Sequence, residues 1–294
     1  MKLLSYGLEY RMEPRLAFSL GDYVIDVMRA SLWMKEDRKA QQYLNLPSSM
    51  RLALQDWSQT FALLKQLEEA FESIEVQGLS IFNRSVAHLI SDIAIFVPIP
   101  DPPSLRYFKT VGKDQMSGFN FGNTQTLFGH GQAQPYSGLT PQGELAAVLA
   151  GSKAGSELKI AGYCIANNWV DIQLSDSEVP GQGGLSRGIA TSLGPFLITA
   201  DELDAHKLGN GFNLDMQVRV NGAAVGEGRL KDMSIAFPDM IRQAAKTNVQ
   251  AGDLFCSGSP ISLADSPCPE MGDLVEVEIQ ALGCLANRVQ PTFP

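Results

Sequence analysis

The side chains that most readily do chemistry, cysteine and histidine, are few in this sequence. The four cysteines, Cys164, Cys256, Cys268 and Cys284, show no CxxC spacing, and the three histidines are scattered along the chain. Tetrahedral zinc sites need closer pairs of such ligands. The spacing therefore argues against a zinc site and favours reduced thiols.

Two further segments invite a chemical interpretation that their surroundings do not support. The run GQGG at 181–184 is rich in glycine, but it lacks the Lys-Ser/Thr pair and the strand-to-helix context of a phosphate-binding loop. His130, in the glycine-rich FGHGQ, has the ring of a general base, yet we expect it in a surface loop. No serine or cysteine has an evident neighbouring base, so a covalent nucleophile is not indicated.

The N-terminal part of the chain is predicted to combine strands with one helix. LAFSLGDYVIDVM (16–28) is typical of two strands around a turn at Gly21-Asp22, because its β-branched residues suit a pleated sheet. Apolar residues recur every three or four positions over 57–75, which predicts an amphipathic helix. The four prolines of VPIPDPPS then interrupt regular structure. We place the domain boundary there, with a small α/β domain at 1–97 and a second domain at 98–294.

The second domain is predicted to be mainly β. MQVRV (216–220) and VEVEI (275–279) alternate strictly between apolar and polar residues, which indicates strands with one buried face. Asn221-Gly222 favours a two-residue hairpin turn, since both residues tolerate positive φ. One helix is expected around FPDMIRQAAK (237–246). The fold class is therefore α+β, mainly β.

The overall charge limits the kinds of partner. A net charge of −9, with no run rich in lysine and arginine, argues against binding to nucleic acid or to an anionic membrane. The longest apolar run, 93–99, is shorter than the roughly 20 residues that span a bilayer, and the N-terminus lacks the continuous apolar stretch of a signal peptide. We therefore expect a cytoplasmic protein with no membrane partner.

Seven motifs, in one order along the chain, carry a resemblance to a known family. They are PSLRYF (103–108), GELAAVLAG (143–151), IAGYCIANNW with DIQ (160–173), ATSLGPFLIT (190–199), NGAAVGEGRLKDM (221–233), GDLFCSGS (252–259) and GDLVEVEIQALGCLANRV (272–289). Over roughly 100–290 the chain thereby resembles the fumarylacetoacetate hydrolase (FAH) family. The resemblance implies an FAH-type mixed β-sheet roll, usually in a homodimer, whose members act on small β-diketo or 2-oxo acids.

The resemblance also implies Mg²⁺ or Mn²⁺ held by carboxylates, and this chain has lost most of those ligands. Tyr107 stands where the family has an aspartate, and Asn168 stands where it has the aspartate of an Asn-Asp pair. Of the family's Glu-x-Glu, the first position is Gln142 and the second is Glu144. Because hard cations prefer anionic oxygen ligands, we expect no metal cofactor and disfavour Mg²⁺ or Mn²⁺.

Positions that match the family's acid–base residues are altered as well. Asp114 falls where the family has a histidine base, and Lys109 falls on a neighbouring tyrosine position. Arg187 replaces a lysine and cannot easily act as a base, since it stays protonated. With Glu144, these three are the expected catalytic residues.

The resemblance places six further side chains in the pocket. The expected substrate-binding residues are Tyr107, Gln142, Asn168, Gln173, Thr191 and Ser259. Arg187 would hold a carboxylate or enolate by a bidentate contact, while Asn168 and Gln173 would donate to a carbonyl oxygen. Burial of Glu144 without a cation would raise its pKa towards a useful acid–base range.

Three functions stay open at this point. The first is a metal-independent isomerase, dehydratase or cyclase acting on a small dicarbonyl, enol or polyketide-like substrate. The second is a Mg²⁺- or Mn²⁺-dependent hydrolase or decarboxylase of β-diketo or 2-oxo acids, and the third is a non-catalytic binding protein on the same fold. Three of the site positions also have a simpler explanation: Asn167-Asn168 as a strand-end turn, Arg187 as a solvated loop charge and Glu144 as a surface acid.

Overall fold

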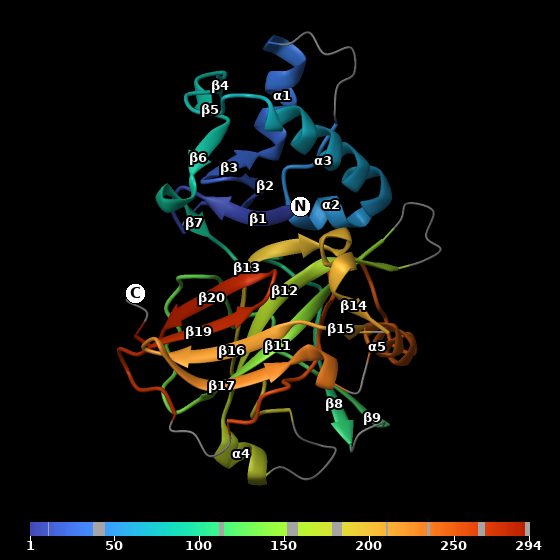
Figure 1. Ribbon diagram of the computed structural model, residues 1–294, viewed down its shortest axis with the longest axis vertical. Coiled ribbons are helices and arrows are strands. Elements are labelled where there is room, and N and C mark those ends of the chain that lie inside the picture. The colour runs from blue at the N-terminus through green and yellow to red at the C-terminus, as the bar shows by residue number, and fades with distance from the viewer. Residues whose placement is uncertain are drawn as a thin grey trace.

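The computed structural model covers most of the chain, and its elements are arranged as Figure 1 shows. The described residues are 1–294 without 11, 38–44, 112–114, 152–157, 178–183, 210, 234–235, 264–267 and 292–294. Of residues 37, 109–111, 115–117 and 176–177 only the backbone is described. No helix in these ranges is long and apolar enough to cross a membrane.

The described residues of the N-terminal part form strands and helices. Its elements are β1 (Lys2–Gly7), β2 (Arg15–Leu20), β3 (Tyr23–Asp26), α1 (Val27–Asp37), α2 (Met50–Gln55), α3 (Trp57–Glu72), β4 (Ser80–Ile81), β5 (Arg84–Ser85), β6 (Ala87–Leu89), η1 (Ile90–Asp92) and β7 (Ala94–Ile95). The strands predicted on either side of Gly21-Asp22 are confirmed as β2 and β3. The predicted helix is α3, which buries Leu64, Leu67 and Phe71. Its apolar stripe thus packs against the sheet, as the periodicity indicates.

The rest of the chain is mainly strand. Its elements are β8 (Leu105–Val111), β9 (Gln115–Phe121), β10 (Leu127–Phe128), β11 (Thr140–Ala150), β12 (Lys159–Val170), α4 (Ile172–Ser177), β13 (Ala190–Thr199), η2 (Ala200–His206), β14 (Lys207–Leu208), β15 (Gly211–Phe212), β16 (Asp215–Val220), β17 (Ala223–Arg229), η3 (Leu230–Asp232), α5 (Phe237–Ala244), β18 (Leu254–Cys256), β19 (Leu274–Ile279) and β20 (Gly283–Arg288). The expected class, α+β but mainly β, is confirmed. The hairpin at Asn221-Gly222 joins β16 to β17, with φ of 51° and 80° at the two residues.

One 12-stranded sheet runs through the molecule in the order β6-β3-β2-β1-β13-β12-β11-β18-β8-β9, with β7 and β10 paired to its side. Strands of both predicted domains belong to it, because β1 pairs with β13 through Lys2 and Leu3. The division at 97/98 therefore stays a prediction. A four-stranded sheet, β17-β16-β19-β20, lies over the long strands β11 and β12 (Figure 1).

The two faces of β11 have different surroundings. Leu145, Ala147 and Leu149 belong to the core that includes Val218 and Val277 of the four-stranded sheet. Side chains alternate along a strand, so residues 142, 144 and 146 lie on the opposite face. That face carries the other core, into which the N-terminal helices pack. The candidate site lies at the end of this second face.

Candidate active site

A pocket of about 540 Å³ opens beside the starts of β11 and α4. We call it the inner pocket; it is lined by Phe108, Gln142, Ser175, Arg187, Asp232, Met233, Ser257, Gly258, Ser259, Pro260, Ile261 and Ser262. Three of the residues expected at the site, Gln142, Arg187 and Ser259, are among them. The pocket is of a size that suits a small organic acid.

Glu144 lies just beyond the inner pocket and is completely buried. Its Oε2 accepts a hydrogen bond from the backbone N–H of Gly258 at 2.9 Å. Its Oε1 accepts one from Asn168 Nδ2 at 3.4 Å and lies 3.5 Å from Arg187 Nη1. Arg187 lines the pocket with its side chain 21 % exposed, so it connects the buried carboxylate to the open pocket.

Strand register explains why these groups meet. Glu144 on β11 is opposite Ala166 on β12, Gln142 is opposite Asn168, and Asn168 is in turn opposite Thr191 on β13. Asn168 and Thr191 therefore share one face of the sheet with Glu144. The intervening residue is Gly143, where a Cβ would come within 2.8 Å of Val277 Cγ1. Glycine thus lets the four-stranded sheet pack closely against β11 behind Glu144.

Burial dominates the electrostatics of Glu144. Loss of solvent raises the pKa of its carboxyl, and this outweighs the opposing effects of Arg187, the Gly258 N–H and Asn168. A raised pKa makes the carboxylate a stronger base than a surface glutamate. The simpler explanation of Glu144 as a surface acid is wrong, because its exposed fraction is 0 %.

Tyr107 and Thr191 form a buried hydroxyl pair near the carboxylate. Their hydroxyls are hydrogen-bonded to each other, and both side chains are at most 2 % exposed. Burial, followed by the neighbouring Cys256 and Glu144, raises the pKa of the Tyr107 phenol well above its usual value. Burial likewise raises the pKa of the Cys256 thiol. Both groups are therefore neutral donors or acceptors at physiological pH.

The remaining predicted residues are placed as follows. Gln142 donates its backbone N–H to Asn167 Oδ1 at 2.9 Å, and Ser259 Oγ accepts from the Ile261 N–H at 3.1 Å. Gln173 lies exposed on α4. The side chain of Lys109, and all of Asp114, lie outside the described residues. Their expected catalytic roles stay predictions.

Gly258 is a contributor that the sequence reasoning missed. Its φ of 80° is readily adopted only by glycine, and this conformation accompanies the N–H contact with Glu144 Oε2. Its position in GDLFCSGS, one residue before Ser259, was the available signal. The contact itself joins residues 114 positions apart and depends on the tertiary fold.

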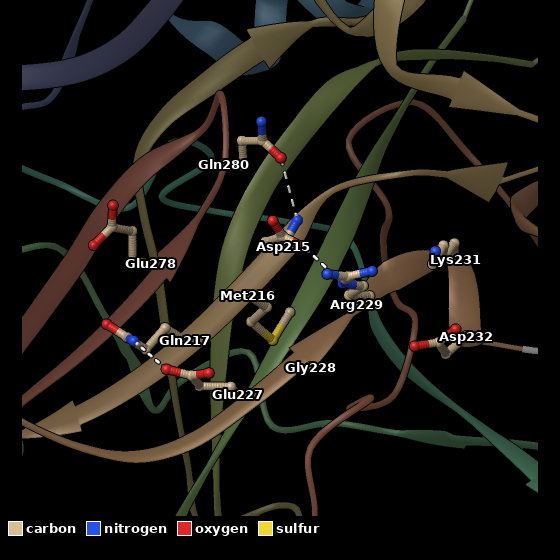
Figure 2. A pocket seen from close by; sticks show the side chains of 10 residues that line it. All are labelled: Asp215, Met216, Gln217, Glu227, Gly228, Arg229, Lys231, Asp232, Glu278 and Gln280. Carbon is tan, nitrogen blue, oxygen red and sulfur yellow. Dashed lines mark hydrogen bonds and ion pairs between the residues drawn. The ribbon is translucent and has the colours of Figure 1, made fainter.

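A second hollow, of about 800 Å³, lies over the four-stranded sheet (Figure 2). We call it the outer groove; it is lined by Asp215, Met216, Gln217, Glu227, Gly228, Arg229, Lys231, Asp232, Glu278 and Gln280. Arg229 pairs with Asp215 at 3.1 Å, and Gln217 donates to Glu227 at 2.7 Å. These groups are largely exposed to water, so their interactions are weak and their reactivity is ordinary.

The comparisons with known proteins agree with this architecture. The fumarylacetoacetate (FAA) hydrolase C-terminal family matches residues 111–290, well over half of the chain. The chain therefore belongs to this family. A 2,4-didehydro-3-deoxy-L-rhamnonate hydrolase of Sphingomonas sp. is 28 % identical over 139 residues, which cover 45 % of this chain and 47 % of the relative.

Two solved structures share the fold over nearly the whole chain. Maleylpyruvate hydrolase from Sphingobium sp. SYK-6, in complex with manganese(II) and pyruvate, has a TM-score of 0.68 and 19 % identity, covering 99 % of each chain. 2-Keto-3-deoxy-D-arabinonate dehydratase, complexed with magnesium and 2,5-dioxopentanoate, has a TM-score of 0.62 and 21 % identity, covering 100 % of each chain. The predicted FAH-type fold is thus confirmed.

These two structures correct our expectation that no metal serves as cofactor, since one holds manganese and the other magnesium. Our inference counted carboxylates alone, whereas Mg²⁺ often keeps several waters and takes oxygens from its substrate.

The described residues do not by themselves fit a divalent ion. No three His, Cys, Asp or Glu among them lie together, and Arg187 already brings a positive charge within 3.5 Å of Glu144. We therefore derive no chemical step through a metal.

Proposed function

We propose that this protein is an enzyme that transfers a proton on a small 2-oxo or β-dicarbonyl acid bound in the inner pocket. One observation carries the proposal: Glu144, fully buried and with a raised pKa, contacts an arginine that also lines the pocket. A buried base next to a cationic binding group is the arrangement expected for chemistry at a carbon beside a carbonyl. The reaction types that use such a step are isomerisation, dehydration and cyclisation.

Arg187 supplies recognition of the acid. Its planar guanidinium can donate two parallel hydrogen bonds to a carboxylate, and it stays protonated throughout the physiological range. A bound carboxylate would compete with Glu144 for this cation. The contact between Arg187 and Glu144 is 3.5 Å, longer than a short charge-assisted hydrogen bond, so the guanidinium can turn towards a ligand without losing a strong partner.

Glu144 supplies the proton transfer. In its ionised form the carboxylate accepts a proton from the carbon next to the substrate carbonyl. The C–H electron pair forms a C=C bond, and the carbonyl π electrons move to the oxygen, giving an enolate. Arg187 stabilises that negative charge. In a substrate with a second C=C bond conjugated with the enolate, the carbonyl re-forms, the C=C bond shifts and the terminal carbon takes the proton back from Glu144, which completes an isomerisation.

Deuterium exchange tests this proposal directly. The natural protein is incubated in D₂O with 2-oxobutanoate or another 2-oxo acid, with and without added Mg²⁺ or Mn²⁺, and exchange at C3 is followed by proton NMR. Exchange faster than in buffer, reduced at least about 100-fold in Glu144→Gln, is the expected result. Absence of catalysed exchange across a panel of such acids, or an unchanged rate in the variant, would contradict the proposal.

A hydrolase is the second candidate, and the 28 % identity to 2,4-didehydro-3-deoxy-L-rhamnonate hydrolase favours it. In that case Glu144 would accept a proton from water that attacks a carbonyl. Release of pyruvate from a 2,4-dioxo acid, measured with lactate dehydrogenase, distinguishes this activity from isomerisation.

We also propose that the protein is a homodimer, as the family resemblance implies. Sedimentation equilibrium is expected to give twice the chain mass of 31.9 kDa. A monomer at every concentration tested would contradict the proposal.

A further inference from the structure

Asn168 has an unused hydrogen-bonding group at the site. Its side chain is completely buried, and its Nδ2 donates to Glu144 Oε1. Its Oδ1 is also buried and has no partner among the described residues. Buried amide oxygens are nearly always hydrogen-bonded, because desolvating one without a replacement bond is costly.

The neighbouring groups do not supply the missing donor. Thr191 faces Asn168 across the strand pair, but its hydroxyl is hydrogen-bonded to Tyr107 and makes no hydrogen bond with Asn168 Oδ1. The backbone N–H of Gly258 is directed to Glu144 Oε2. The opposite orientation of the Asn168 amide does not remove the unpaired atom. Nδ2 would then lack an acceptor, and Oδ1 would face the Glu144 carboxylate. The described part of the chain therefore offers no donor to Oδ1, which leaves this acceptor available to a ligand.

We propose that Asn168 determines specificity by accepting, through Oδ1, a hydrogen bond from a ligand hydroxyl. The inference rests on the proposed function, in which Arg187 binds the ligand carboxylate. Asn168 Nδ2 donates to the same Glu144 oxygen that Arg187 approaches, and Arg187 lines the inner pocket, so Glu144 and Arg187 connect Asn168 to the proposed carboxylate site. The ligand class is thus a 2-hydroxy acid or the enol form of a 2-oxo acid.

This role differs from that of a donor to a carbonyl oxygen. A ketone has no proton to offer, whereas a hydroxyl or an enol has one. A site that hydrogen-bonds a ligand hydroxyl rejects the analogue that lacks it, because the buried acceptor is then left unpaired. Asn168 would therefore favour the hydroxyl-bearing form over its deoxy counterpart of the same charge and similar size.

The test compares lactate with propionate, which differ by this one hydroxyl. Binding is measured by calorimetry or ligand-observed NMR, with and without magnesium. The natural protein is expected to prefer lactate by about tenfold or more. Asn168→Leu should abolish the preference for lactate. Asn168→Asp keeps Oδ1 as an acceptor, so it should retain the ratio of the two affinities while charge repulsion weakens the binding of both acids. Asn167→Asp is the control, because Asn167 lies on the opposite face, where its Oδ1 accepts from the Gln142 N–H. Its ratio of lactate to propionate affinity should match that of the natural protein.

Two outcomes would overturn the inference: no preference for lactate in the natural protein, or an unchanged preference in Asn168→Leu. Arg187→Gln separates this failure from failure of the proposed function. Arg187→Gln should weaken the binding of lactate and of propionate equally. If neither acid binds more weakly to it, the proposed carboxylate site is wrong. If both bind more weakly while Asn168→Leu keeps the preference for lactate, only the role of Asn168 is wrong.

Discussion

The outer groove is larger than the inner pocket, about 800 Å³ against about 540 Å³, and it carries more charged side chains. Its carboxylates are open to water, as shown by Asp215 with 69 % and Glu278 with 50 % of the side chain exposed. The inner pocket shares the exposed Asp232 with the outer groove, but it also leads to Glu144, a carboxylate from which water is excluded. The two hollows thus differ in the environment of their acids.

This difference decides which hollow can do chemistry. Solvent screens the exposed pairs of the outer groove and leaves each group with modest interactions. Beside the inner pocket, burial raises the pKa of Glu144, and Asn168 Oδ1 has no partner among the described residues. Perturbed acids and unpaired buried atoms are features of functional sites, so they are better guides here than volume.

The largest expected effect comes from removing the buried acid. Glu144→Gln keeps the size of the side chain but cannot accept the proton, and it should lower kcat by at least about 100-fold with little change in KM. Glu227→Gln, the same substitution in the outer groove, should leave both constants within about twofold of the natural values, as expected for a surface change far from the chemistry. Steady-state kinetics on a substrate found in the exchange assay measures both. Equal effects of the two substitutions would contradict the assignment of the chemistry to the inner pocket.

Removing the cation from each hollow should give a smaller contrast. Arg187→Gln is expected to raise the dissociation constant of a 2-oxo acid by about 10- to 100-fold, because a charge-assisted bidentate contact is lost. Arg229→Gln, which breaks only the exposed pair with Asp215, should leave it unchanged. Calorimetric titration with pyruvate tests both variants. If only Arg229→Gln binds pyruvate more weakly, the acid binds in the outer groove and not in the inner pocket.

Carboxylates restored at the family's ligand positions should create tighter metal binding at the inner pocket. Gln142→Glu combined with Asn168→Asp adds two acids beside Glu144, and we expect Mg²⁺ to bind at least about tenfold more tightly than to the natural protein. Asn167→Asp adds an acid on the other face of β12 and should not produce this gain. Titration calorimetry gives both affinities. If the double variant gains nothing, these positions do not converge on a cation.

The smallest expected effect is on stability. Because the pKa of Glu144 is raised in the folded state above the usual 4.5, the folded protein holds this proton more tightly than the unfolded chain does. The resulting contribution to stability is fully present below pH 4.5 and is lost as the pH rises through the raised pKa. Relative to Glu144→Gln, the natural protein should therefore lose unfolding free energy as the pH increases through this window. Denaturant unfolding at several pH values measures this, and a difference that does not vary with pH would contradict it.

Much of the fold follows from local sequence patterns. Asn221-Gly222 adopts the two positive φ values that its hairpin requires, and the apolar spacing over 57–75 corresponds to α3. Such features depend on neighbouring residues, which a sequence displays directly. The single sheet shared by β1 and β13 depends on pairing between distant strands, so local patterns do not predict it.

The site could be predicted only in part. Motif matching indicated Glu144, Asn168 and Arg187, which the structure brings together. The direction of the Asn168 amide could not be anticipated, because it depends on the contact of Nδ2 with Glu144, 24 positions away. No described residue pairs with its Oδ1. Metal use was predicted wrongly, since carboxylate counts neglect the water and substrate oxygens that complete a coordination shell.

The most direct test is a crystal structure of the protein grown with pyruvate and manganese(II). We expect the pyruvate carboxylate to lie in the inner pocket, within hydrogen-bonding distance of the Arg187 guanidinium, with its carbonyl end towards Glu144. Pyruvate bound in the outer groove against Arg229, or an inner pocket in which Arg187 makes no contact with the acid, would contradict it.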